Sequence, residues 1–108
     1  MKKNYREMSD EELDAWKQKL DESGVVGDPT EAHRRALRAL QNPIRREILT
    51  MLKEKTLTIE EIVNHLNLDE KTLGFHLQFL KDIFFITVEG KTVDLTPIGV
   101  AYTRHAMK

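Results

Sequence analysis

Apolar positions recur at helical spacing along most of the chain. Near the N-terminus, Leu13, Trp16 and Leu20 follow one another at i, i+3 and i+7 and form a narrow stripe. The preceding residues 9–12, Ser-Asp-Glu-Glu, have the pattern of a capping box. We therefore predict a first helix that begins after Ser9 and ends at Ser23-Gly24.

Two further helices are predicted next, after a short connector, Val25-Val26-Gly27. Asp28-Pro29 and Asn42-Pro43 each place a capping side chain before a proline at the first helical position. The apolar side of the earlier helix consists of Ala32, Ala36, Leu37 and Leu40. The inward positions of the later helix are Ile44, Ile48, Leu49 and Leu52.

The centre of the chain has the pattern of a helix-turn-helix. Residues 58–61, Thr-Ile-Glu-Glu, form another capping box, and the apolar positions behind it are Ile59, Ile62, Val63 and Leu66. Asn67 tolerates the left-handed conformation that ends a helix, and Asp69 can cap the next one. Two short helices separated by about three residues are typical of this motif.

After Asp82 the apolar period changes from that of a helix to that of a strand. Residues 85–88 and 92–95 are rich in β-branched and aromatic side chains, with Glu89-Gly90-Lys91 between them, so a hairpin is predicted. Thr96-Pro97 then starts a final helix. One face of that helix carries Ile98, Ala101, Tyr102 and His105. The predicted fold class is mainly α with a small β-hairpin, a winged helix-turn-helix with an added N-terminal helix.

Length and composition limit the organisation of the chain. A chain of 108 residues is expected to form one domain, here with an N-terminal helical extension at 1–27 and the winged helix-turn-helix at 28–108. It contains no cysteine, no apolar run long enough for a membrane helix, and no secretory signal pattern. We therefore expect a cytoplasmic protein with no membrane partner.

Positive charge is concentrated in one block, although the net charge of the whole chain is only −1. Residues 31–46 carry five arginines against a single glutamate. Arg45 and Arg46 lie one turn inside a helix N-terminus, where guanidinium and amide groups together suit a phosphate. Arg34, Arg35 and Arg38 spread over more than one helix face, so we interpret them as a solvated surface.

Three motifs resemble the ArsR-type winged-helix repressors. Residues 40–49, Leu-Gln-Asn-Pro-Ile-Arg-Arg-Glu-Ile-Leu, are similar to that family's entry into its second helix. Residues 68–80 resemble its recognition helix in their leucines, Thr72 and the His76-Leu77 pair. Residues 95–99, Leu-Thr-Pro-Ile-Gly, are similar to the exit from the wing, with some likeness to MarR-type regulators. The resemblance implies a homodimeric transcriptional regulator, with the recognition helix at about 69–82 in the major groove of double-stranded DNA and the wing at about 85–95 near the backbone.

The chain departs from that family at two places. Where metal-sensing members have Cys-x-Cys, this chain has Thr58-Ile59-Glu60, which excludes thiolate sensing there. Members carry a small hydroxyl and a basic residue where this chain has Gly74 and Phe75. Direct base readout then depends mainly on Lys71, Thr72 and Gln78, with Phe75 able to contact a thymine methyl. The predicted DNA-binding residues are Arg45, Arg46, Thr58, Lys71, Thr72, Gly74, Phe75, Gln78 and Lys91.

The remaining candidate chemistry is sparse. His76 lies beside the leucine stripe, and a hydrogen-bonded core histidine is the favoured interpretation over a ligand. His33, His65 and His105 are scattered singly, and Asp94 with His105 gives only half of a final-helix zinc pattern. No phosphate loop, nucleophile elbow or His-Glu-x-x-His motif occurs. We expect no enzyme activity, no cofactor and no metal, and the sequence does not reveal whether an effector exists.

A second interpretation keeps the fold and changes the partner. Winged helices can also serve as protein interaction modules with little or no DNA binding, because fold does not fix function. Glu70 and Phe75 favour that alternative, whereas Arg45, Arg46 and Lys91 favour DNA.

Overall fold

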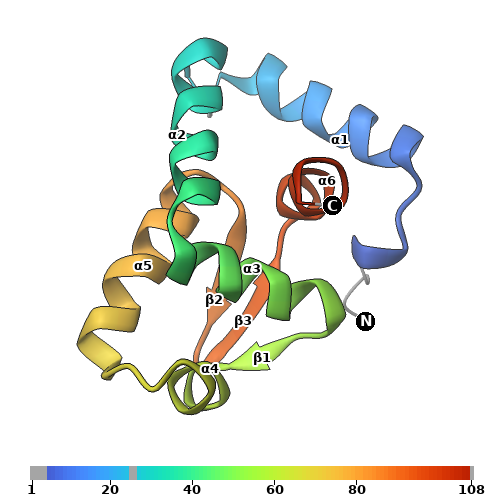
Figure 1. Cartoon of the computed structure of the whole chain (residues 1–108). Helices are drawn as coiled ribbons and strands as arrows, with labels where there is room; N and C mark the ends of the chain where they lie inside the picture. The colour runs from blue at the N-terminus through green and yellow to red at the C-terminus, as the bar shows by residue number, and fades with distance from the viewer. Residues whose placement is uncertain (1–4, 25–26, 108) are drawn as a thin grey trace.

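Helices surround a small antiparallel sheet in the computed structural model, which describes residues 5–24 and 27–107 (Figure 1). The helices are α1 (Asp10–Ser23), α2 (Pro29–Gln41), α3 (Pro43–Glu54), α4 (Ile59–Leu66), α5 (Glu70–Asp82) and α6 (Pro97–Ala106), with a 3₁₀ turn at Tyr5–Glu7. The strands are β1 (Leu57–Thr58), β2 (Ile86–Glu89) and β3 (Thr92–Leu95). None of the helices in the described ranges is long and apolar enough to span a membrane.

The helix starts predicted from the sequence are confirmed at their caps. Ser9 accepts a hydrogen bond from the Glu12 N–H while the Glu12 carboxylate accepts from the Ser9 N–H, each at 3.1 Å. Asp28 caps α2 and Asn42 caps α3 through their side-chain oxygens. Gly24 ends α1 in the left-handed region, with φ of 77°. Val25 and Val26 of the predicted connector lie outside the described residues.

The helix-turn-helix is formed by α4 and α5. Asn67 ends α4 with φ of 55°, the left-handed conformation expected of it, and its N–H bonds to the Val63 carbonyl. Asp69 then caps α5 by accepting from the Thr72 N–H at 2.6 Å. Leu73, Leu77 and Leu80 are buried and fix the inner face of α5.

The sheet has the strand order β1-β3-β2, all antiparallel. The predicted hairpin is confirmed, with Val88 opposite Val93 and Glu89 opposite Thr92. Strand β1 is not predictable from the local sequence, because a two-residue strand has no period of its own. Leu57 and Thr58 pair with Val93 and Thr92, so this short strand ties the start of α4 to the wing.

One prediction about the core is wrong. Leu37 was expected on the apolar side of α2, but 43% of its surface is exposed, while Ala39 is fully buried. The buried side of α2 carries Ala36, Ala39 and Leu40, and Ala36 lines a hollow together with Phe85 and Ile98. The neighbours of α2 in the fold decide which side of the helix is buried, and Leu37 lies outside that side.

The deepest face of α6 also differs from the face predicted. Ile98 of the predicted face is buried, but so are Gly99, Val100 and Thr103. Tyr102 is half-buried and His105 is exposed. A Cβ atom at Gly99 would lie 2.1 Å from the Phe85 carbonyl oxygen. The backbone of α6 therefore approaches the chain before β2 more closely than any side chain would allow.

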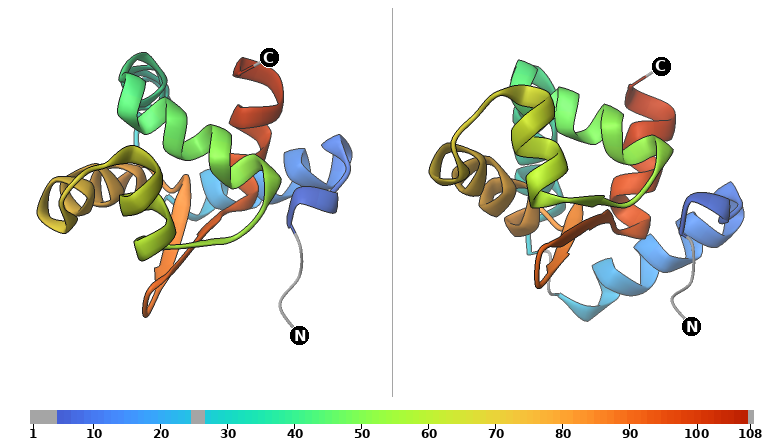
Figure 2. Two further views of the ribbon diagram at one scale, coloured as in Figure 1. Left: turned by 60° about the horizontal axis from the view of Figure 1, so that its bottom comes forward. Right: turned by 90° about the horizontal axis from the view of Figure 1, so that it is seen from below.

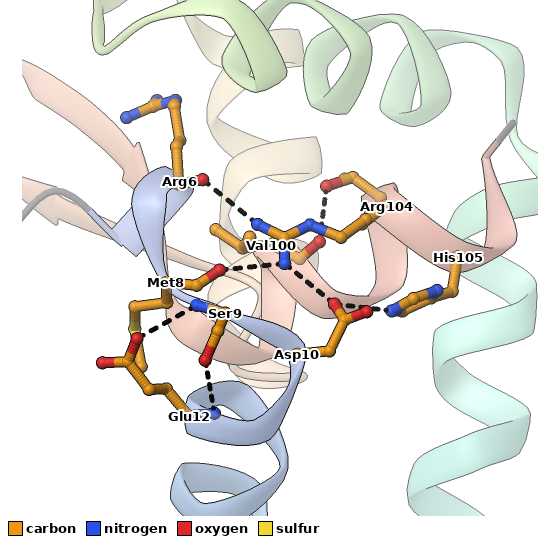
Figure 3. Close-up of polar contacts among 9 residues, drawn as sticks. Arg6, Met8, Ser9, Asp10, Glu12, Val100, Arg104 and His105 are labelled. Carbon is orange, nitrogen blue, oxygen red and sulfur yellow. Dashed lines mark hydrogen bonds and ion pairs between the residues drawn. The ribbon is translucent and has the colours of Figure 1, made fainter.

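The N-terminal segment packs on α6 within the same chain. Met8 and Leu13 are almost completely buried. The Arg104 guanidinium donates to the Met8 and Arg6 carbonyl oxygens and to Asp10, at 2.9, 3.1 and 2.9 Å (Figure 3). We call this cluster the N-terminal clasp. It holds α1 on the opposite side of the molecule from α5, which leaves α5 and the hairpin uncovered by α1 (Figure 2).

Candidate nucleic-acid interface

The outer face of α5 is the most distinctive exposed surface of the fold. Because the leucines of α5 point inward, Lys71, Phe75 and Gln78 lie together on its opposite side, at i, i+4 and i+7. Phe75 is 71% exposed, more than any other large hydrophobic side chain in the described residues. Gly74 lies on the edge of this face, with nothing within 4 Å of the position a Cβ would take.

The charges around this face are mixed. Gln78 donates to Asp82 at 2.8 Å, so its amide is oriented along the helix. Lys71 is exposed between Glu70 and Thr72 at the start of the helix. Hydrogen bonds from the hydroxyl and the N–H of Thr72 lower the pKa of Asp69. The N-cap of α5 therefore remains a carboxylate over the whole neutral range.

Two other predicted DNA-binding residues lie at the ends of secondary-structure elements. The Thr58 hydroxyl accepts from the Glu61 N–H at 3.1 Å, so it is already used as the N-cap of α4. Lys91 is exposed at the tip of the hairpin, and its carbonyl accepts from the Ile59 N–H at 2.9 Å. That bond fixes the wing tip relative to the helix-turn-helix.

The two arginines of α3 have different surroundings. Arg46 is exposed, and its guanidinium makes a 3.4 Å bond to the Leu40 carbonyl. The Arg45 guanidinium instead lies over the ring of Phe79 in α5, with its central carbon 3.9 Å from the ring centroid. Nε and Nη1 of Arg45 are buried without a hydrogen-bond partner among the described residues. Burial also lowers the pKa of Arg45.

His76 is buried, as predicted, but the hydrogen bond expected at its ring is missing at one nitrogen. Only 8% of its surface is exposed, and Nδ1 has no partner in the described part of the chain. The Phe75 ring meets the His76 ring edge-on, with centroids 5.8 Å apart. Burial first, and the Arg45 charge second, lower the pKa of His76. His76 is therefore neutral at pH 7.

The lowered pKa of His76 makes stability depend on pH. The unfolded chain takes up a proton at the ordinary histidine pKa of about 6.5, whereas the folded chain does so only at lower pH. The free energy of unfolding should therefore fall as the pH drops from 7.5 through the folded pKa of His76. In urea titrations between pH 5 and 8, His76→Leu should remove that part of the dependence. If the variant and the wild type show the same dependence of unfolding free energy on pH, the lowered pKa of His76 is contradicted.

The other histidines do not come together in a metal site. His33 bonds to Tyr102, His65 to Glu47 and His105 to Asp10. No group of three or more metal-ligating side chains occurs within residues 5–24 and 27–107. Asp94 binds Arg6 at 2.6 Å rather than His105.

A cleft on the other side of the molecule lies between three helices. It has a volume of about 340 Å³ and is lined by residues that include Lys17 of α1, His33 of α2, and Tyr102 and His105 of α6. It is separate from the α5 face and contains none of the predicted DNA-binding residues.

Sequence reasoning did not single out Phe79. Phe79 follows the buried His76 by three residues and the exposed Phe75 by four, so by period alone it lies at the boundary between the buried stripe and the outer face. Its role depends on how α3 crosses α5, for which the local pattern carries no signal.

A family model and several solved structures place this geometry among known folds. Residues 42–83 match the model of the bacterial regulatory protein, arsR family. The matched segment runs from the cap of α3 to the end of α5, so the resemblance drawn from the sequence is supported for this segment. None of the curated proteins matches the chain.

Solved structures resemble the chain over most of its length. HlyU from Vibrio cholerae N16961 is 23% identical with a TM-score of 0.59, over 76% of this chain and 99% of its own. The transcriptional regulator HlyU from Vibrio vulnificus CMCP6 is 25% identical with a TM-score of 0.55, over 88% and 93%. NolR from Sinorhizobium fredii is 21% identical with a TM-score of 0.59, over 99% and 93%. The predicted fold class, a mainly α winged helix with a small sheet, is confirmed. The MarR-like character of the wing exit stays a prediction.

Proposed function

We propose that this protein is a DNA-binding transcriptional regulator that inserts α5 into the major groove. The observation that carries the proposal is the exposed Lys71–Phe75–Gln78 face of α5, which lies within the segment that matches the arsR family model. An α-helix held by its inner leucines and free on its outer side fits the width of the major groove. One of the similar solved structures is described as a transcriptional regulator, which supports the same function.

The proposed contacts divide into base readout and phosphate binding. Lys71 and Gln78 can pair with guanine and adenine edges, and Phe75 can pack on a thymine methyl. Thr72 contacts a base edge or a phosphate, Gly74 permits close approach, and the position of Thr58 brings the cap of α4 near the backbone. The cations proposed at phosphates are Arg46 in α3 and Lys91 at the wing tip.

We further propose that the regulator is a homodimer without enzyme activity. Leu37 and Trp16 are 43% and 36% exposed and lie outside the helix-turn-helix, as does the cleft between α1, α2 and α6. A second copy would cover such apolar surface in a two-fold dimer. Two recognition helices would then read a palindrome with half-sites one helical turn apart, about 34 Å.

Equilibrium binding to a random-sequence duplex, measured by fluorescence anisotropy over a series of salt concentrations, tests this function. We expect affinity that falls steeply with salt and a saturation point of two protomers per short duplex. Arg46→Met should reduce the slope of the double-logarithmic salt plot by about 0.9, the value for one phosphate contact. No measurable binding at low salt would contradict the proposal.

A substitution at Phe75 separates readout of DNA from binding of a protein. Phe75→Ala should weaken binding to the duplex that the wild type enriches from a random pool and leave binding to random duplex unchanged. The loss should be about fivefold to tenfold, because one apolar contact with a thymine methyl is removed. Phe75→Arg should tighten binding to both duplexes.

The second candidate function is a protein interaction module, and the exposure of Phe75 is the observation that favours it. A single aromatic side chain with 71% of its surface in solvent is also typical of an anchor for a protein partner. If Phe75→Ala leaves DNA binding untouched but abolishes a protein complex, this second function replaces the first.

A further inference from the structure

The contact between Arg45 and Phe79 joins the start of α3 to the middle of the recognition helix. The two residues are more than thirty positions apart in the sequence, and the central carbon of the guanidinium lies 3.9 Å from the ring centroid. Next to them, His76 is buried and neutral. Phe75, on the outer face of α5, contacts the His76 ring edge-on. The Arg45–Phe79 pair and the Phe75–His76 pair therefore involve neighbouring positions of α5.

The guanidinium of Arg45 is packed so that two of its N–H donors do not reach water. Nε and Nη1 are buried and lack hydrogen-bond partners among the described residues. Buried donors without partners are rare in native proteins, because water is lost and nothing replaces it. The attraction between the cation and the electron-rich face of the Phe79 ring offsets that loss, and it is strongest where water is excluded.

A phosphate ligand would need the opposite arrangement. Guanidinium groups that bind phosphate present their N–H edge to solvent, so that two donors reach two oxygens. In Arg45, Nε and Nη1 have no access to water, so each two-donor edge of the guanidinium lacks one of its donors. The neighbouring Arg46 is exposed and is free of this constraint.

We propose that Arg45 is a positioning residue, which fixes the orientation of α5 against α3 by stacking on Phe79, and does not itself bind DNA phosphate. This inference rests on the DNA-binding function proposed above. It predicts that the planar shape of the guanidinium matters as much as its charge. A lysine at this position keeps the charge but lacks the flat face that covers the ring.

The test compares Arg45→Lys, Arg45→Met and Phe79→Leu with Arg46→Met as the matched control from the next position. Affinity is measured for random duplex and for the duplex that the wild type enriches from a random pool, at a temperature where urea titrations show every variant folded. We expect the first three variants to bind the enriched duplex about tenfold more weakly with an unchanged salt slope, and to lose most of their preference over random DNA. Only Arg46→Met should lower the slope, by about 0.9.

A double-mutant cycle completes the test. Arg45→Met combined with Phe79→Leu should bind the enriched duplex no more weakly than either single variant, because both remove the same contact. The inference is overturned if Arg45→Met lowers the salt slope and Arg45→Lys restores wild-type binding, or if the folded variants keep wild-type affinity and preference. A wild type that binds no DNA would instead overturn the proposed function, and this inference with it.

Discussion

Gly99→Ala should be the most destabilising conservative substitution in the protein. A Cβ at this buried position would lie 2.1 Å from the Phe85 carbonyl oxygen and 3.1 Å from Leu95 Cδ2. The Phe85 carbonyl cannot move freely, because it accepts from the Thr96 N–H at 3.0 Å. The Thr96 hydroxyl in turn donates to the Phe84 carbonyl. Relief of the clash must therefore separate α6 from the chain before β2.

The expected cost is about 3 kcal/mol, because an overpacked core contact is combined with at least one broken backbone hydrogen bond. For a chain of this size the melting temperature should fall by roughly 15 °C in calorimetry. Gly74→Ala is the matched control. Its new methyl group meets nothing within 4 Å, and alanine is the better helix former, so it should stabilise the protein by up to about 1 kcal/mol. Equal effects of the two substitutions would contradict the packing of α6.

Arg104→Ala should release the N-terminal segment while the rest of the fold remains intact. The Arg104 guanidinium donates to the carbonyl oxygens of Arg6 and Met8, and alanine would leave both without this donor (Figure 3). Charged hydrogen bonds to partly buried groups contribute about 1.5–3 kcal/mol, and a loss near the lower end is expected because Arg104 is itself partly exposed.

Hydrogen exchange shows which part of the protein is destabilised by Arg104→Ala. Amides of α1 should lose protection in Arg104→Ala, whereas those of α5, on the opposite side of the molecule, should keep it (Figure 2). The clasp does contact α3, through the 2.8 Å bond from Arg6 Nε to the Leu52 carbonyl. His105→Ala is the control: its single 3.2 Å contact with Asp10 lies on an exposed surface, so the variant should change little. Uniform loss of protection across the chain would show that the N-terminal segment opens only when the whole protein unfolds, which would contradict this prediction.

The local features of the fold could be predicted because their causes are local. Capping boxes at Ser9 and Thr58, and the left-handed Asn67, each depend on residues within four positions of one another. They set the limits of the helices and hence the helix-turn-helix.

The features that escaped prediction depend on residues far apart in the chain. The strand β1 exists only because β3 pairs with it, and Arg104 finds its partners more than ninety residues away. Hydrophobicity places Leu37 in the core, but the packing of α2 on the rest of the fold buries Ala36 and Ala39 instead.

The candidate site shows the same division. The period of the leucines in α5 predicts which residues face outward, and Lys71, Phe75 and Gln78 are exposed accordingly. The same reasoning treated Arg45 and Arg46 as equivalent, because both follow the cap of α3. Only the crossing of α3 and α5 distinguishes them: Arg45 lies over the ring of Phe79, whereas Arg46 is exposed to solvent.

The central claim is that α5 and the wing bind DNA. Backbone amide chemical shifts, recorded while the enriched duplex is added to the labelled protein, test this claim most directly. The claim predicts that the shifts which change lie in α5, at residues 70–82, and at the wing tip, at residues 89–92. Amides of α1, on the opposite side of the molecule, should keep their positions (Figure 2). Changes confined to α1, α2 and α6, or no change at low salt with the duplex in excess, would contradict the account.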